Sequence, residues 1–264
     1  MGRVIAIVNE KGGVAKTTST KNIAIGLANE GRKVLAIDTD PSTNLTTSLG
    51  IKPNEEIGDI CDIYEHFMKN PQVGEPKKGI YHQEEGIDVV PSSDRLSAVK
   101  KVLSSVTIPV VVLRTYINTI RDQYDYILID CPAGSDLLPT NALFAADSLI
   151  IPMQPHALSV DALRNLLDRI NEVRILNGTG NKPEILGVLF TMVRSETNND
   201  RHITEWLKNE YGNLMYFFKA FIPQTCKLPE SDLEKKSIFK YAPNSPAAVF
   251  YKDLIKEILS FEEK

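Results

Sequence analysis

The sequence predicts an α/β protein built on a single doubly wound, mostly parallel sheet with helices on both faces. Two observations predict this class. Short runs rich in β-branched residues alternate with longer amphipathic stretches, which is the pattern of βαβ units. The runs at 126–129 and 148–151 are continuous rather than alternating, as expected of strands covered on both faces. We therefore expect these two runs at the centre of the sheet.

The same pattern places the individual elements in chain order. We expect strands at about 3–9, 33–37, 87–91, 125–130, 147–152 and 185–191. We expect helices at about 16–30, 93–105, 109–122, 158–175, 198–211 and 245–261. Residues 51–86 carry more turn formers and charge, including Pro53, Pro71 and Pro76. They predict an inserted segment with one helix near 57–68.

Length and composition bound the class of protein. With 264 residues, of which 42% are hydrophobic and 24% charged, one domain over residues 1–264 can bury an ample core. The net charge of −4 excludes a protein whose whole surface binds nucleic acid, but it permits a local basic patch. No apolar run approaches the length of a membrane span, and Val4 to Val8 is too short for a signal peptide.

The cysteines predict the compartment. Cys61, Cys131 and Cys226 are few, odd in number and far apart, so they indicate neither a disulfide framework nor a zinc site. Cys131 follows an apolar strand and is expected to be a small core residue. We expect a reducing cytoplasm.

A glycine-rich segment follows the first predicted strand directly. Residues 9–18 read NEKGGVAKTT, and a helical pattern begins behind them. In such a turn, backbone N–H groups point at phosphate oxygens, and the helix N-terminus adds favourable partial charge. We expect Lys16 to reach the β- and γ-phosphates of a nucleotide and the Thr17 hydroxyl to bind Mg²⁺. The predicted nucleotide-binding residues of this loop are Gly12, Gly13, Val14, Ala15, Lys16, Thr17 and Thr18.

The loop departs from the ordinary pattern GxxxxGK[ST], because Ala15 stands where that pattern has glycine before Lys16. It fits xKGGxxK[ST], in which a second lysine, here Lys11, opens the loop. This form resembles the deviant Walker A family of P-loop NTPases, which contains ParA, MinD, the arsenical-pump ATPase and the nitrogenase iron protein. The resemblance implies a homodimer around ATP, in which Lys11 crosses to the other subunit's nucleotide as an arginine finger does. Taken alone, a Lys-Gly-Gly segment also suits a surface turn.

Carboxylates follow two of the predicted strands. Asp38 and Asp40 end the second strand, and Asp130 follows the apolar run at 126–129. The carboxyl ends of parallel strands form the edge where ligands of open α/β sheets bind. A carboxylate after such a strand is the Walker B arrangement, which holds Mg²⁺ beside Thr17. In isolation, the Asp38–Pro41 segment also suits a helix cap and Asp130 a β-turn.

The resemblance also assigns roles to these carboxylates. It implies that Asp38 belongs to the Mg²⁺ shell with Thr17 and Asp130, and that Asp40 positions or activates the attacking water. The predicted catalytic residues are Lys11, Lys16 and Asp40. The family commonly continues Asp-Pro-Gln-Gly-Asn, whereas this chain keeps the final asparagine and lacks the glutamine.

Later segments resemble the partition branch, meaning the ParA-type, Soj-like proteins. Matching stretches occur at 140–143, 145–147, 150–154 and, in the tail, from the Ile-Pro pair at 222–223 onward. In that branch the segment beginning at the Ile-Pro pair borders the adenine, so the resemblance implies that Pro223 and Gln224 contact the base. An ordinary exit from strand to loop is the alternative for these two residues.

The partition branch also implies partners and a cellular role. It implies segregation of plasmid or chromosomal DNA in the bacterial cytoplasm, association with the nucleoid, a slow basal ATPase and a ParB-like partner. Lys227 matches one of the branch's two basic markers for non-specific DNA binding. At the other marker this chain has Glu196, with Arg194 and Arg201 close by. Because the first predicted strand begins at about residue 3, we expect no N-terminal winged-helix domain.

Three alternatives remain open from the sequence. A MinD-like positioning ATPase at the membrane fits Pro132-Ala133-Gly134, but residues 252–264 carry three Lys against four acids, which does not suit a basic lipid anchor. An iron–sulfur scaffold would need cysteines on loops at a dimer interface. An inactive nucleotide-binding protein disagrees with the retained acids and lysines of the loop and strand ends.

Overall fold

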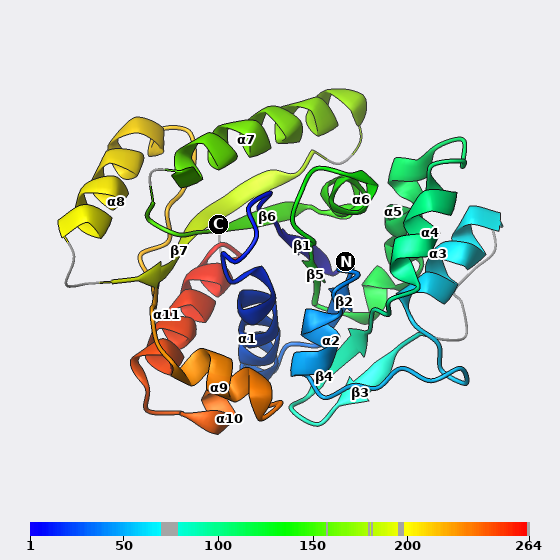
Figure 1. The fold of residues 1–264 in the computed structure, drawn as a ribbon, viewed down its shortest axis with the longest axis horizontal. Coiled ribbons are helices and arrows are strands. Elements are labelled where there is room, and N and C mark those ends of the chain that lie inside the picture. The colour runs from blue at the N-terminus through cyan, green and yellow to red at the C-terminus, as the bar shows by residue number, and fades with distance from the viewer. Residues whose placement is uncertain (70–78, 157, 179, 181, 195–197, 263–264) are drawn as a thin grey trace.

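A computed structural model describes residues 1–69, 79–156, 158–178, 180, 182–194 and 198–262. Within these residues, eight strands form one sheet in the order β3-β4-β2-β5-β1-β6-β7-β8 (Figure 1). All neighbours are parallel except β3, which pairs antiparallel with β4 at one edge. The strands are β1 (Arg3–Ile7), β2 (Val34–Asp38), β3 (Tyr81–Gln83), β4 (Ile87–Val90), β5 (Tyr126–Asp130), β6 (Ser148–Met153), β7 (Glu184–Val193) and β8 (Ile222–Pro223). The predicted fold class is therefore confirmed.

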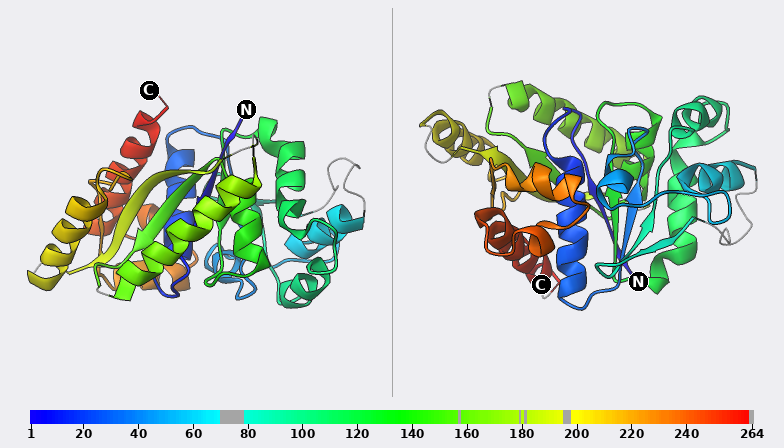
Figure 2. Two further views of the ribbon diagram at one scale, coloured as in Figure 1. Left: turned by 90° about the horizontal axis from the view of Figure 1, so that it is seen from above. Right: turned by 60° about the horizontal axis from the view of Figure 1, so that its bottom comes forward.

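The helices connect these strands and cover both faces of the sheet. They are α1 (Lys16–Asn29), α2 (Asn44–Ser48), α3 (Ile60–Lys69), α4 (Leu96–Leu103), α5 (Val112–Ile120), α6 (Leu137–Ala145), α7 (Leu158–Leu176), α8 (Asn198–Tyr211), α9 (Lys227–Leu233), α10 (Ile238–Tyr241) and α11 (Pro246–Ser260). Figure 2 shows α1 and α11 on one side of the sheet and α6 and α7 on the other. None of the helices in the described ranges is long and apolar enough to cross a bilayer.

Alternate residues of one strand enter two separate cores. In β1, Val4 and Ala6 pack in the core that includes α3 to α7, whereas Ile5 and Ile7 pack in the core with α1 and α11. Both faces of the strand are buried, so its sequence has no polar alternation. The strands β5 and β6 flank β1, which confirms their predicted central place.

The segment at 51–86 lies at the β3 edge of the sheet. Its helix, predicted at 57–68, is α3, and Tyr64 and Phe67 of that helix are buried in the core. Its second element, β3, extends the sheet by pairing with β4. Part of this segment, residues 70–78, lies outside the described residues.

Candidate functional site

The loop between β1 and α1 is held by its carbonyl oxygens. Gln154 Nε2, just beyond β6, donates to the Gly13 oxygen over 3.1 Å. Thr191 Oγ1 of β7 donates to the Val14 oxygen, also over 3.1 Å. Because a peptide group is planar and trans, an anchored carbonyl turns the next residue's N–H to the opposite side. The N–H groups of Val14 and Ala15 are therefore turned away from Gln154 and Thr191.

Helix α1 begins at this loop without a side-chain cap. Ala15 precedes the helix in the left-handed conformation, at φ 63° and ψ 34°, and its side chain makes no capping hydrogen bond. The first N–H groups of a helix have no partner within it and carry partial positive charge, which favours an anion. Glycine adopts this left-handed conformation without strain, whereas Ala15 adopts it at a cost of about 1 kcal/mol because of its Cβ. The departure from the glycine pattern therefore costs strain and keeps the left-handed turn.

The Lys16 side chain folds back over the loop. Its Nζ donates to the Lys11 carbonyl over 3.0 Å, and only 7% of the residue is exposed. Burial lowers the pKa of Lys16, and the negative charge of Asp130 opposes this effect. A phosphate anion in the loop would place a negative charge beside this mostly buried amine and favour its charged form.

The end of β5 supplies a carboxylate to the start of α1. Asp130 Oδ2 accepts from Thr17 Oγ1 over 2.7 Å, and Asp130 Oδ1 accepts from Thr20 Oγ1 over 3.0 Å. Asp130 is fully buried, and this burial raises its pKa, with the nearby Asp38 adding to the effect. A buried carboxylate and a hydroxyl at hydrogen-bond distance are hard oxygen donors that fit Mg²⁺. A bound cation would offset the burial penalty on the ionised acid.

The end of β2 supplies the second buried carboxylate. Asp38 Oδ1 accepts from the Asp40 N–H over 3.0 Å, and Oδ2 accepts from the Thr46 N–H and Oγ1 over 2.9 and 2.7 Å. Burial raises the pKa of Asp38, and these donors oppose the rise. Asp40 is half-buried, and its Oδ1 accepts from the Ser42 N–H over 2.8 Å. The more accessible carboxylate is thus Asp40, at the same sheet edge.

No cluster of three or more His, Cys, Asp or Glu side chains among the described residues is arranged to hold a metal ion. In nucleotide sites, Mg²⁺ is bound by one or two carboxylates together with phosphates and water. Thr17, Asp38 and Asp130 therefore fit a shared role with a nucleotide.

The Lys11 side chain contacts a different element from the one that the Lys16 side chain contacts. Its Nζ donates to Ser159 Oγ over 3.3 Å, in the first turn of α7 of the same chain. A cation gains nothing from a helix N-terminus, where the partial charge is positive. The amine must leave Ser159 if it is to act on a second subunit, so the in-trans role of Lys11 stays a prediction.

The predicted adenine contacts lie on β8. Pro223 pairs with Val193 of β7, and Gln224 donates its N–H to the Val193 oxygen over 3.0 Å. Ile222, the first residue of β8, pairs with Thr191, the residue that anchors the phosphate loop. Pro223 and Gln224 therefore follow at the loop's edge of the sheet, and base contact stays a prediction.

The predicted DNA-binding residues fall into two places. Arg194 and Arg201 line one groove of about 460 Å³ between α8 and β7, together with Lys208 and Lys219. The groove also holds Asp200, which is buried and pairs with Arg194 over 3.3 Å.

Lys227 is elsewhere, at the start of α9. Its Nζ forms an ion pair with Glu230 over 2.8 Å, and Glu230 also accepts from the Tyr241 hydroxyl. The structure thus brings Arg194 and Arg201 together and leaves Lys227 outside their groove. DNA contact by any of the three stays a prediction.

Sequence reasoning missed several residues that shape the site. Gln154 and Thr191 anchor the loop, Thr20 and Thr46 hold the buried carboxylates, and Ser159 accepts from Lys11. Most come from segments far from the residue they contact, so no local pattern marks them. Thr20 is the exception, since it lies one helical turn after Lys16 on the face that meets Asp130.

The P-loop class of nucleotide-binding proteins is defined by a strand, a glycine-rich loop, a helix whose first N–H groups have no side-chain cap, and carboxylates at neighbouring strand ends. Comparison with known proteins narrows this class. The sequence profile of the family described as "AAA domain" matches residues 2–180. The chain is 35% identical over 259 residues to the sporulation initiation inhibitor protein Soj of Bacillus subtilis, covering 98% of each. It is 31% identical over 262 residues to the chromosome partitioning protein ParA of Caulobacter vibrioides, covering 98% of this chain and 95% of that one.

Solved structures agree with this placement. Cobyrinic acid a,c-diamide synthase of Mycobacterium smegmatis, with bound ADP and magnesium, matches with a TM-score of 0.83 at 26% identity, covering 100% of this chain and 96% of that one. This match confirms the fold, and the two relatives with the family profile confirm the resemblance inferred from the loop. The chain belongs to the ParA-type ATPases.

Proposed function

We propose that this chain is an ATPase that dimerises around ATP, binds DNA without sequence preference and segregates plasmid or chromosomal DNA with a ParB-like partner. One observation carries the proposal: a loop with two lysines, Lys11 and Lys16, meets the buried carboxylates Asp38 and Asp130 at one sheet edge. The similarity to Soj and ParA along nearly the whole chain supports the partition branch.

Each residue has a role in the proposed hydrolysis of ATP to ADP and phosphate. Lys16 and the loop N–H groups bind phosphate oxygens, while Pro223 and Gln224 border the adenine. Thr17, Asp38 and Asp130 would hold Mg²⁺, which when bound neutralises phosphate charge. Asp40 positions the attacking water, and the Lys11 of each subunit reaches the nucleotide of the other.

Dimerisation links hydrolysis to DNA binding in this proposal. A dimer doubles the number of basic side chains near DNA, and phosphate contacts add through counterion release. Arg194, Arg201 and Lys227 are the proposed contacts on each subunit. Basal hydrolysis is slow, because the water is held correctly only after dimer and partner contacts form. The proposed location is the bacterial cytoplasm, at the nucleoid.

DNA binding with and without ATP tests the proposal. The purified chain with Mg²⁺ and a non-hydrolysable ATP analogue is expected to bind a random DNA duplex at low salt, to bind unrelated duplexes equally, and to lose binding steeply as salt rises. With ADP, binding should be weak. No affinity for the duplex in the ATP state would contradict the proposal, and anionic liposomes then test the MinD-like alternative.

A further inference from the structure

The Asp38 carboxylate depends on one residue for most of its contacts. Oδ2 accepts two hydrogen bonds from Thr46, one from the N–H over 2.9 Å and one from Oγ1 over 2.7 Å. Among the described residues, its other oxygen accepts from the N–H of Asp40, two residues along the chain. Asp38 is fully buried, so water does not compete for these sites. The side-chain orientation of Asp38 is therefore set mainly from α2.

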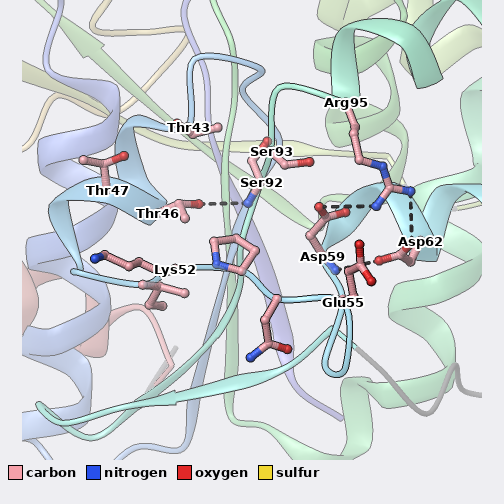
Figure 3. Close-up of a pocket in the computed structure, with 14 residues that line it drawn as sticks. Thr43, Thr46, Thr47, Lys52, Glu55, Asp59, Asp62, Ser92, Ser93 and Arg95 are labelled. Carbon is pink, nitrogen blue, oxygen red and sulfur yellow. Dashed lines mark hydrogen bonds and ion pairs between the residues drawn. The ribbon is translucent and has the colours of Figure 1, made fainter.

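A backbone N–H just after β4 sets the direction of the Thr46 hydroxyl. The Ser92 N–H donates to Thr46 Oγ1 over 2.8 Å (Figure 3). A hydroxyl has one hydrogen, and its oxygen can accept at the same time as that hydrogen is donated. With the Ser92 N–H occupying a lone pair, the hydrogen of Thr46 is free to go to Asp38. The hydrogen bonds thus run in one direction: Ser92 donates to Thr46, and Thr46 donates to the Asp38 carboxylate.

The fold delivers Thr46 to this position through a strained turn. Thr43, just before α2, adopts a left-handed conformation at φ 56°, which bends the chain back beneath the end of β2. Thr46 then faces the core and is 3% exposed, while the next residue, Thr47, is exposed on the same helix. Both threonines line the cavity of about 810 Å³ drawn in Figure 3. Thr46 therefore both lines this cavity and contacts Asp38.

We propose that Thr46 is a positioning residue of the ATPase site, which holds the Asp38 carboxylate in the orientation needed toward Mg²⁺·ATP, with the Ser92 N–H setting the direction of its hydroxyl. The inference rests on the proposed function, because it assigns Asp38 to the Mg²⁺ shell. Residues that orient a metal-binding carboxylate typically change metal affinity about 10- to 100-fold when removed. Thr46 touches neither nucleotide nor water in this role.

Four proteins test the proposal: the natural chain, Thr46→Val, Thr46→Ser and Thr47→Val. Thr46→Val keeps the shape and removes the hydroxyl, and Thr46→Ser restores the hydroxyl. Thr47→Val is the matched control, because it makes the same change one residue along at an exposed site lining the same cavity. The first measurement is binding of a fluorescent ATP analogue at increasing Mg²⁺ concentration and in EDTA. The second is steady-state ATPase activity over the same Mg²⁺ range.

Thr46→Val should need about 10- to 100-fold more Mg²⁺ for half-maximal effect in both measurements. Its affinity for the analogue in EDTA should be unchanged, which separates a metal-specific role from loss of the fold. Thr46→Ser and Thr47→Val should behave as the natural chain does.

An unchanged Mg²⁺ dependence in Thr46→Val would overturn the inference and leave the proposed function standing. Two further results together would also overturn the inference: weaker binding of the analogue in EDTA by Thr46→Val, and a Mg²⁺ response as impaired in Thr46→Ser as in Thr46→Val. The hydroxyl would then not be the group that matters. Absence of Mg²⁺-dependent analogue binding by the natural chain would overturn the proposed function and the inference together.

Discussion

The sheet edge that carries the loop at 9–18 with Asp38 and Asp130, called the phosphate edge after its proposed role, and the groove beside α8 differ in how their polar side chains are held. At the phosphate edge, Asp38 and Asp130 are fully buried, and each of their oxygens accepts at least one hydrogen bond. In the groove, the side chain of Arg194 is 53% exposed and pairs with an acid. The first region holds buried carboxylates with every oxygen hydrogen-bonded, whereas the second presents partly exposed charge at the surface.

This difference suggests how each region would work. Chemistry on a phosphate needs donors fixed before the reaction, because a preorganised site does not have to reorganise in the transition state. Sequence-independent DNA binding needs only enough positive charge near the backbone phosphates. Single substitutions should therefore have large effects at the phosphate edge and small, additive effects in the groove.

The largest effect is expected for Lys11→Ala. If Lys11 acts on the nucleotide of the other subunit, its removal should abolish the ATP-dependent dimer and lower hydrolysis about 10³-fold, as loss of an arginine finger does. Sedimentation with a non-hydrolysable ATP analogue and a phosphate-release assay measure the two effects. Lys256→Ala, at an exposed lysine of α11, is the control. An unchanged dimer in Lys11→Ala would rule out the in-trans assignment.

Asp40→Ala should separate binding from turnover at the same edge. Asp40 is the accessible carboxylate, and its N–H, which supports Asp38, survives the substitution. We expect ATP binding and the dimer to persist while hydrolysis falls about 100-fold or more, the usual contribution of a positioned base. The protein should accumulate as an ATP-bound dimer in sedimentation. Hydrolysis at the natural rate would show that Asp40 has no role in positioning water.

Two lysine–acid pairs, one with a buried lysine and one exposed, test how burial changes the value of a charged partner. Lys21 of α1 is fully buried and pairs with Asp232 of α9, whereas Lys227 pairs with Glu230 at an exposed site. Asp232→Ala leaves a buried charge without its partner, so the free energy of unfolding should fall by about 3 kcal/mol. Glu230→Ala should change it little, because an exposed pair is screened by water. Urea unfolding of both variants measures the difference, and equal midpoints would contradict it.

The smallest effects are expected in DNA binding. In the Asp40→Ala background, which should retain ATP, Arg201→Ala should reduce the slope of log affinity against log salt by about 0.9 for each lost phosphate contact. Lys227→Ala should also flatten the slope and weaken binding modestly, because Lys227 must first leave Glu230. Fluorescence anisotropy with a random duplex over a salt series measures both. Unaltered slopes would remove these residues from the proposed DNA surface.

The sequence predicted the long elements and missed the short ones and one apolar helix. The six predicted strands and the predicted long helices are present, because each extends far enough to show its period. The strands β3 and β8 are only three and two residues long. The helix α6 was missed because it is apolar on nearly every side and contains Pro139, so it shows no amphipathic face.

By itself, the sequence determined the family and predicted the phosphate loop and the carboxylates at the strand ends, because each of these features is encoded by neighbouring residues within a short stretch of chain. Tertiary structure alone decided what holds them. Thr46 reaches Asp38 from α2, Thr191 reaches the loop from β7, and Ser159 receives Lys11 from α7. Such contacts depend on strand order and on the direction of single hydroxyl groups, and neither leaves a periodic trace along the chain.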